Sequence, residues 1–218
     1  MIIFTKGVFD FLGTFQFFKE FKFLKMQIQN NPQEKTKTSD EELMVRLGKG
    51  HDFCLDLLVE RYKLKIINFV YRMVGDLDQA EDIAQEVFIR VYRHRERYQP
   101  IAKFSTWLYT IAANLAKSEL RRRSIFNPIS LTRLKGERLS SIKKGPDEAL
   151  LERELGQKIQ QEIGKLKPKY RVPLILRDIE GLSYVEISQI VDCPLGTVKS
   201  RINRARLQIR ERMDDYLG

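Results

Sequence analysis

The feature that most limits the fold of this chain is its apolar residues at helical spacing, interrupted at short intervals by helix caps. Between positions 55 and 73 the apolar residues recur at three- and four-residue steps, as on one face of an amphipathic helix. The same spacing recurs at residues 80–91, 108–115 and 187–209. No stretch has the strict apolar–polar alternation of a half-buried strand. The sequence therefore predicts an all-α protein.

Capping boxes predict where several of these helices begin. Each has a Ser or Asp followed three residues later by Glu, so that two free backbone N–H groups find side-chain acceptors. The three are Ser39–Glu42, Asp78–Glu81 and Ser183–Glu186. A further start is expected at Ser105, and Pro194 is expected to be the first residue of the last helix.

Composition and periodicity divide the chain into four segments. Residues 39–123 and 146–218 are expected to form two small helical domains, the second with a helix-turn-helix. Residues 124–145 hold Pro, Gly, Ser and Lys without a sustained period, which predicts a flexible linker. Residues 1–38 form an N-terminal extension, rich in phenylalanine and then polar.

The first 25 residues contain eight of the 13 phenylalanines. Asp10 and Lys19 interrupt the apolar run well short of the ~20 residues that a membrane span needs. A signal peptide fits poorly, because no small-residue cleavage site follows. We expect translation to begin at Met26, and an amphipathic membrane-surface anchor is the alternative.

Charge and cysteine content narrow the class of protein. Lys and Arg exceed Asp and Glu by 39 to 29, which gives a net charge of +10 and favours a polyanionic partner. The two cysteines lie far apart in sequence, so we expect no disulfide scaffold and a reducing cytoplasm. His51 and Cys54 have the spacing of a metal-ligand pair, but no second pair completes a zinc site. We predict no metal site.

A helix-turn-helix is predicted between residues 183 and 206. A short capped helix, a turn at 192–194 and a long basic helix follow one another there. The long helix carries six Lys or Arg against one Glu between positions 196 and 212. Because the N-terminal residues of such a helix face base edges in the major groove, the candidate DNA-reading residues are Lys199, Ser200, Asn203 and Arg204.

A second basic cluster mixes cations with aromatic rings. Residues 90–123 contain nine Lys or Arg against two Glu, with Tyr98, Phe104, Trp107 and Tyr109 between them. Cations that follow a backbone and rings that stack on bases suit single-stranded nucleic acid. A core role for part of the aromatic set, Trp107 included, stays open.

Asp82, Gln85 and Glu86 lie together opposite the apolar face of their helix. Exposed carboxylates there suit docking of a basic protein helix, or simply favour the N-terminal end of their own helix. Both interpretations stay open.

Four ordered motifs between residues 39 and 213 resemble a known family. Residues 78–88, DQAEDIAQEVF, and 104–114, FSTWLYTIAAN, resemble the core region of bacterial sigma-70 factors. Residues 181–187, GLSYVEI, and 194–201, PLGTVKSR, followed by RAR at 204–206, resemble their C-terminal DNA-binding region. With two domains and a short linker, the chain resembles the small extracytoplasmic-function type.

The resemblance implies a transcription initiation factor, acting in a stress or envelope response, that binds core RNA polymerase through the β′ clamp helices and the β flap. It implies polymerase contacts at Asp82, Gln85 and Glu86. It places the opened minus-ten element and its flipped bases at Tyr98, Lys103, Phe104, Trp107, Tyr109, Lys117, Arg121 and Arg122. It places the minus-thirty-five element at Thr197, Lys199, Ser200, Arg201, Asn203 and Arg204.

The resemblance also implies that the chain is cytoplasmic and that its partners include an anti-sigma factor, which can sequester it at the membrane. It implies neither a cofactor nor a small-molecule substrate. Two other classes fit the sequence less well. A conventional repressor would need an effector or dimerisation domain. Residues 39–123 contain no set of residues typical of such a domain. An enzyme would need a nucleophile elbow, a phosphate loop or a metal set, and we find none in the sequence.

Overall fold

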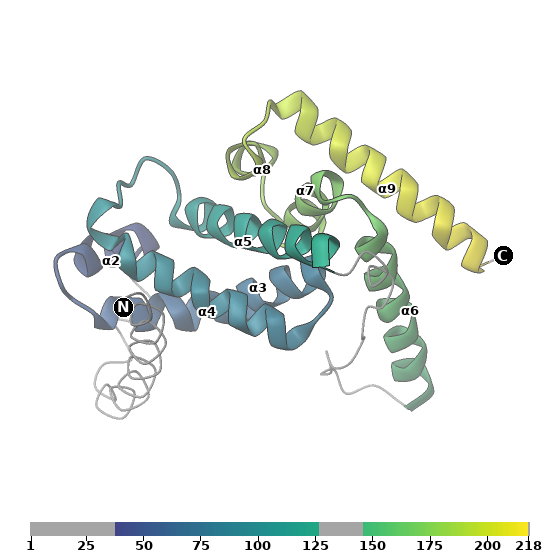
Figure 1. Cartoon of the computed structure of the whole chain (residues 1–218), viewed down its shortest axis with the longest axis horizontal. Coiled ribbons are helices and arrows are strands. Elements are labelled where there is room, and N and C mark those ends of the chain that lie inside the picture. The colour runs from purple at the N-terminus through teal and green to yellow at the C-terminus, as the bar shows by residue number, and fades with distance from the viewer. Residues whose placement is uncertain (1–37, 127–145, 218) are drawn as a thin grey trace, which may run out of the picture. The chain divides into compact units, whose positions relative to one another are not determined.

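A computed structural model describes residues 38–126 and 146–217, without the side chains of 126, 146–154 and 215–217. All regular structure in this part of the chain is helical, as predicted (Figure 1). The N-terminal phenylalanine-rich segment and most of the predicted linker lie outside the described residues. The helices are α2 (Asp40–Gly48), α3 (Phe53–Val74), α4 (Leu77–Arg93), the 3-10 helix η1 (Arg95–Arg97), α5 (Phe104–Phe126), α6 (Pro146–Lys165), α7 (Pro168–Asp178), α8 (Tyr184–Val191) and α9 (Leu195–Leu217).

Helices α2 to α5 pack around α3, which contacts the other three. Phe69, Phe104 and Leu108 are fully buried in this core, where the predicted apolar faces meet. Helix α3 ends at Gly75, whose φ of 75° lies in the left-handed region that glycine adopts without strain. Helix α4 follows at once, nearly antiparallel to α3 (Figure 1).

Two predicted caps prove to be wrong. The side chain of Asp76, rather than that of Asp78, caps α4 by accepting a hydrogen bond from the free backbone N–H of Gln79 at 3.0 Å. At the start of α5, the backbone N–H of Phe104 donates to the carboxylate of Glu41 in α2 at 2.9 Å. Ser105 is therefore not the cap, because a carboxylate from a distant helix takes that role.

Helices α6 to α9 form the second set, in which α7 packs against both α8 and α9. Apolar side chains from α7, α8 and α9, including Leu176, Ile187 and Ile202, are buried between these helices. The predicted capping box of α8 is present: Ser183 accepts from the N–H of Glu186, whose carboxylate accepts from the N–H of Ser183. Helix α9 begins at Leu195, directly after Pro194.

The two helix sets are in contact with each other. Helix α5 packs against α8, and α3 packs against α6 and α7. Together α2 to α9 form one compact unit. Residues 124–126 continue α5, so the linker begins later than predicted.

Candidate nucleic-acid interface

The helix-turn-helix is held together by short-range contacts at its turn. Asp192 ends α8 with a φ of 48°, a left-handed conformation that Asp tolerates better than most residues. The hydroxyl of Ser188 donates to the carbonyl of Cys193 at 2.6 Å. Because Ile187, Ile190 and Val198 are buried, the angle between α8 and α9 is set by packing.

One face of α9 is open to solvent at the positions predicted to read DNA. The side chains of Lys199, Ser200, Asn203 and Arg204 are all exposed, whereas Val198, Ile202 and Ala205 on the opposite face are buried. The exposed set offers cationic donors and one amide, the groups that pair with guanine and adenine edges.

Thr197 and Arg201 belong to the same predicted set but are partly covered. The guanidinium of Arg201 lies 3.5 Å from the sulfur of Cys193. The carbonyl of Thr197 accepts the hydroxyl of Ser200 at 2.9 Å. The contact with Cys193 directs Arg201 toward the turn.

Two other cations of α9 hold the helix in place within the protein. Arg206 donates to both carboxylate oxygens of Asp178, at 2.9 and 2.5 Å. Arg212 lies 3.7 Å from Glu162, a carboxylate of α6 that is only 1% exposed. Arg204 forms a hydrogen bond with Tyr170 of α7, and Lys199 lies over the ring of Tyr184. The cations of the basic face therefore differ in their partners within the protein, which sequence alone does not show.

A cavity of about 440 Å³ opens between the end of α4, the loop at residues 98–103 and α5. Tyr98 and Trp107 line it, with their rings 5.4 Å apart and tilted by 47°. Ile101 at its rim is 86% exposed. The remaining lining residues are Arg90, His94, Arg97, Gln99, Ala102 and Ile111. The cavity thus combines ring faces, cations and one amide.

Not all the predicted aromatics face this cavity. The ring of Phe104 is fully buried, 5.5 Å from the ring of Tyr62 and 6.1 Å from that of Trp107. Tyr109 is 3% exposed and packs edge-on against Phe69. In this conformation neither ring can stack on a base, because protein atoms already cover both. Burial also raises the pKa of the Tyr98 hydroxyl to about 12, so Tyr98 is neutral at physiological pH.

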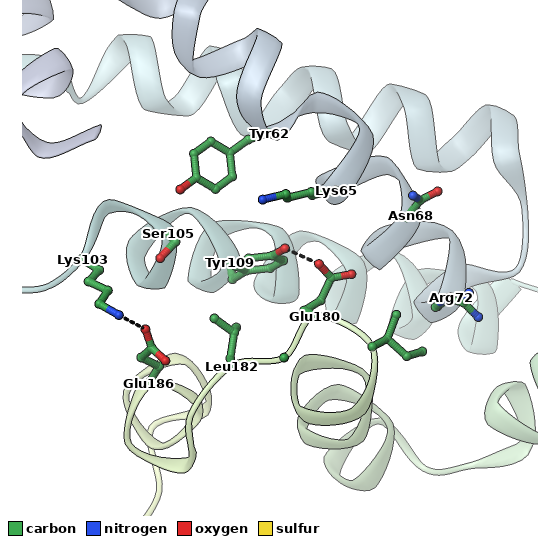
Figure 2. Close-up of a pocket in the computed structure, with 12 residues that line it drawn as sticks. Tyr62, Lys65, Asn68, Arg72, Lys103, Ser105, Tyr109, Glu180, Leu182 and Glu186 are labelled. Carbon is green, nitrogen blue, oxygen red and sulfur yellow. Dashed lines mark hydrogen bonds and ion pairs between the residues drawn. The ribbon is translucent and has the colours of Figure 1, made fainter. Parts of the chain in front are cut away.

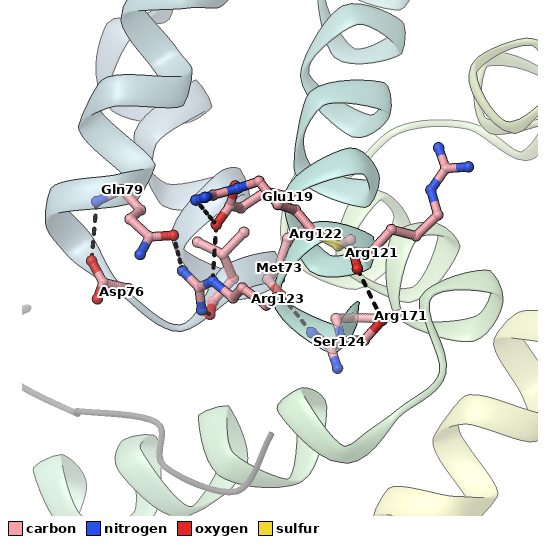
Figure 3. Close-up of polar contacts among 10 residues, drawn as sticks. Met73, Asp76, Gln79, Glu119, Arg121, Arg122, Arg123, Ser124 and Arg171 are labelled. Carbon is pink, nitrogen blue, oxygen red and sulfur yellow. Dashed lines mark hydrogen bonds and ion pairs between the residues drawn. The ribbon is translucent and has the colours of Figure 1, made fainter. Parts of the chain in front are cut away.

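The basic end of α5 is partly committed to internal contacts (Figure 3). Arg122 and Arg123 both bind the carboxylate of Glu119. The hydrogen bond from Arg122 is the main cause of the lowered pKa of Glu119. Arg123 also donates to the carbonyl of Val74 at 2.8 Å. Arg121 is exposed, and burial lowers the pKa of the half-buried Lys117.

The acidic face of α4 lies away from the core. Asp82 and Gln85 are exposed, and Glu86 is partly exposed with an ion pair of 2.8 Å to Arg90, one turn further along. Three neighbouring acceptors on a solvent-facing helix give a surface that a basic helix can complement.

One set of contacts between the two helix sets has no local sequence pattern that predicts it. Lys103 at the start of α5 forms an ion pair of 2.8 Å with Glu186 of α8. The hydroxyl of Tyr109 donates to Glu180, in the loop before α8, at 2.5 Å. Both contacts line a polar cavity of about 600 Å³ (Figure 2). The partners are 83 and 71 residues apart, so no local pattern relates them.

Other candidate chemistry is absent from the part of the chain that the structure describes. Cys54 is completely buried and His51 is exposed. Residues 38–126 and 146–217 contain no group of three or more His, Cys, Asp or Glu side chains that could hold a metal ion. Among the described helices, none is both long and apolar enough to cross a membrane.

Two family models match the chain. The model of Sigma-70 region 2 matches residues 58–125, which include the acidic face of α4 and the aromatic cavity. The model of Sigma-70, region 4 matches residues 156–209, which include the helix-turn-helix.

Curated relatives match over most of their length. The RNA polymerase sigma-H factor of Pseudomonas aeruginosa is 37% identical, over 84% of this chain and 97% of the relative. The ECF RNA polymerase sigma factor SigW of Bacillus subtilis is 39% identical, over 80% of this chain and 99% of the relative. The ECF RNA polymerase sigma-E factor of Escherichia coli K12 is 38% identical, over 82% of this chain and 96% of the relative.

Solved structures share the fold. CnrH in complex with the cytosolic domain of CnrY superimposes with a TM-score of 0.62 at 20% identity, over 82% of this chain and 99% of that one. The sigma factor RpoE of Bartonella quintana, in complex with the anti-sigma factor NepR, superimposes with a TM-score of 0.55 at 24% identity, over 75% of this chain and 97% of that one.

Proposed function

The chain belongs to the sigma-70 family, in its extracytoplasmic-function type, and from this premise we propose how its surfaces divide the work of promoter recognition. It is a transcription initiation factor that directs core RNA polymerase to promoter DNA. The observation that carries the proposal is the presence of two surfaces whose different chemistry suits two forms of nucleic acid. One is an aromatic cavity with cations at its wall, and the other is the exposed basic face of α9.

The exposed face of α9 reads duplex DNA at the minus-thirty-five element. Lys199, Asn203 and Arg204 supply the hydrogen-bonding groups for base edges, and Ser200 contacts a base or a phosphate. Thr197 and Arg201 position the start of the helix and contact the backbone from its edge.

The aromatic cavity captures a base flipped out of the opened minus-ten element. A cavity of about 440 Å³ has room for one nucleobase, and Tyr98 and Trp107 supply ring faces for it. Lys103, Lys117, Arg121 and Arg122 follow the phosphates of the same strand. Phe104 supports the cavity from beneath and does not touch the base.

The acidic face at Asp82, Gln85 and Glu86 docks on the β′ clamp helices of the polymerase, and the second helix set binds the β flap. The sigma factor RpoE of Bartonella quintana was solved in complex with the anti-sigma factor NepR, which supports a partner of that kind for this chain in a stress or envelope response. The chain acts without catalysis of its own and without a cofactor, in the cytoplasm, where a membrane-associated anti-sigma factor can sequester it.

In vitro transcription with core polymerase on a promoter library tests the function. Start-site sequencing should yield a family of promoters that require this chain and share two elements. Binding to such promoters should be weak for the chain alone and specific for the holoenzyme. Tight operator binding without polymerase, together with no initiation, would identify a conventional repressor instead.

Replacing Trp107 with alanine should reduce promoter opening by about 5- to 150-fold, since base–aromatic stacking contributes about 1–3 kcal/mol per base. Opening is measured by the fluorescence of 2-aminopurine in the minus-ten element. Trp107→Phe keeps a ring at the cavity and serves as the matched control, and both variants should bind core polymerase normally. Unchanged opening in a folded Trp107→Ala variant would remove Trp107 from the base-capture site.

A further inference from the structure

Two of the cations that we assign to base reading are each contacted by a tyrosine from a neighbouring helix. Arg204 forms a hydrogen bond with Tyr170 of α7, and the ammonium group of Lys199 lies 5.7 Å from the centre of the Tyr184 ring of α8. Helices α7 and α8 both pack against α9. Both tyrosines are partly exposed, so each reaches from a packed helix toward the solvent-facing side of α9.

The contact with Tyr170 engages only part of the Arg204 guanidinium. Arginine can only donate hydrogen bonds, so the Tyr170 oxygen is the acceptor. This hydrogen bond is the main cause of the lowered pKa of Tyr170. A guanidinium carries several N–H donors in one plane, and the exposed side chain of Arg204 keeps other donors for a base edge.

Such a hydrogen bond matters because base reading by arginine depends on orientation. Bidentate pairing with guanine requires the position and the plane of the guanidinium to be fixed. A long side chain that is free in solution loses rotamers when it binds, and this loss costs affinity. The Tyr170 hydroxyl restricts Arg204 before DNA arrives. The Tyr170 ring has a neighbour of its own, because the ammonium group of Lys169 lies 5.1 Å from its centre.

Tyr184, the first residue of α8, is contacted by three cations. The guanidinium carbon of Arg177 lies 4.7 Å from its ring centre, and the ammonium group of Lys199 lies 5.7 Å from it. Its hydroxyl forms a hydrogen bond with Arg206. A cation within about 6 Å of a ring centre is attracted by the ring electrons. The ring therefore gives Lys199 a preferred direction without occupying its N–H donors.

Both tyrosines stand on a frame that is complete without DNA. Arg206 of α9 donates to both carboxylate oxygens of Asp178 at the end of α7, at 2.9 and 2.5 Å. Arg177 of α7 donates to the carbonyl of Leu182, in the loop before α8, at 2.9 Å. These contacts join α7, α8 and α9. The base-reading cations are therefore oriented by residues whose own places are fixed by the tertiary structure.

We propose that Tyr170 and Tyr184 are positioning residues for promoter recognition: Tyr170 orients Arg204 through its hydroxyl, and Tyr184 orients Lys199 through its ring. The inference rests on the function proposed above for α9. It predicts opposite requirements at the two positions, because one tyrosine acts through an oxygen and the other through a ring face. Replacement by phenylalanine should therefore be harmful at position 170 and tolerated at position 184.

Selection from a randomised minus-thirty-five library by variant holoenzymes measures the base preference at each position, as the ratio of the preferred base to the next. Arg204→Ala and Lys199→Ala first identify the positions that the two cations read. Tyr170→Phe should lower the preference at the Arg204 position by about three- to ten-fold and leave the other positions unchanged. An unchanged preference there, or an even loss of binding across all sequences, would overturn the role of Tyr170.

A double variant tests whether Tyr170 acts through Arg204. In the Arg204→Ala background, Tyr170→Phe should have no further effect on the base preference, because the side chain that it orients has been removed. An equal effect with and without Arg204 would mean that Tyr170 contacts DNA itself, and the positioning role would be wrong.

Two variants at Tyr184 separate its ring from its hydroxyl. Tyr184→Leu should lower the preference at the Lys199 position by about two- to five-fold, as expected for the loss of an exposed cation–π contact. Tyr184→Phe should keep the wild-type preference, and it is also the matched control for Tyr170→Phe, since both remove only a hydroxyl. Loss of preference in both Tyr184 variants, or in neither, would contradict orientation by the ring.

The outcomes distinguish this inference from the proposed function. Absence of initiation by the wild-type holoenzyme from every library member would contradict the proposed function itself. A relaxed preference in Arg204→Ala with a wild-type preference in Tyr170→Phe would leave that function intact and overturn the positioning role of Tyr170. Circular dichroism and the affinity for core polymerase should stay unchanged in each variant, because misfolding would reduce initiation from all promoters alike.

Discussion

Replacing Arg204 with alanine should lower transcription from promoters with an intact minus-thirty-five element by about 5- to 150-fold. Arg204 is exposed on the face of α9 that carries Lys199 and Asn203, one turn after Ser200. A bidentate contact from Arg to a guanine edge contributes about 1–3 kcal/mol to base discrimination. The loss should therefore be large on the preferred promoter and small on a promoter with that base changed.

The matched control is Arg210→Ala, an exposed arginine on the same helix, two turns nearer its end. Since the end of a recognition helix lies beyond the bases, Arg210 is expected to contact phosphate only. Its removal should weaken binding evenly across sequences and reduce the salt dependence by about one counterion.

Selection of promoters from a randomised minus-thirty-five library, with wild-type and variant holoenzymes, distinguishes the two residues. Arg204→Ala should relax the preference at one position of the element, and Arg210→Ala should leave the selected sequence unchanged. If both variants selected the wild-type sequence, Arg204 would be a phosphate contact and base reading would rest on Lys199 and Asn203.

The helix-turn-helix could be predicted from sequence because its determinants are local. Ser183 and Glu186 are three residues apart, and their capping box forms as predicted. The buried positions on α9 follow from helical spacing alone. Arg206 and Arg212 could not be separated from Arg204 in this way. Their acidic partners are in α7 and α6, and only the tertiary fold brings them together.

The exposure of the aromatic residues assigned to the minus-ten element could be predicted only in part, for a related reason. Sequence analysis placed Tyr98 and Trp107 in a cationic, aromatic segment, and they line the cavity. It also assigned Phe104 and Tyr109 to nucleic acid, yet both are buried. Phe104 lies one turn before the buried Leu108 and packs against Tyr62 of α3, so helical spacing alone could have placed it in the core. Tyr109 is covered by Phe69 of α3 and also by Glu180, which precedes α8. Periodicity within α5 does not reveal this second contact.

No sequence pattern predicts a structural role for Arg171, and yet its replacement should have the largest effect on the free energy of unfolding. It stands beside a run of buried apolar residues in α7 and is itself only 7% exposed. Its guanidinium donates to the carbonyls of Leu166, at 2.8 Å, of Gly164 and of Met73. Burial lowers its pKa to about 10, so it remains a cation at physiological pH.

Arg171→Met should lower the free energy of unfolding by about 3–5 kcal/mol, since hydrogen bonds to a charged donor contribute about 1.5–3 kcal/mol each and buried carbonyls would be left without a donor. Urea unfolding followed by circular dichroism measures the loss. Arg171→Lys should recover part of it, because one ammonium cannot reach three carbonyls in the planar geometry of a guanidinium. Lys169→Met, an exposed change on the same helix, should alter stability by less than about 0.5 kcal/mol.

Arg171 binds three carbonyls. That of Gly164 is in the last turn of α6, that of Leu166 comes just after α6, and that of Met73 is in α3. The contacts to Gly164 and Leu166 therefore hold the turn between α6 and α7, and the contact to Met73 joins this turn to the end of α3. In Arg171→Met, hydrogen exchange should therefore accelerate most in α6 and α7. An equal acceleration in α3 would mean instead that Arg171 acts mainly through Met73.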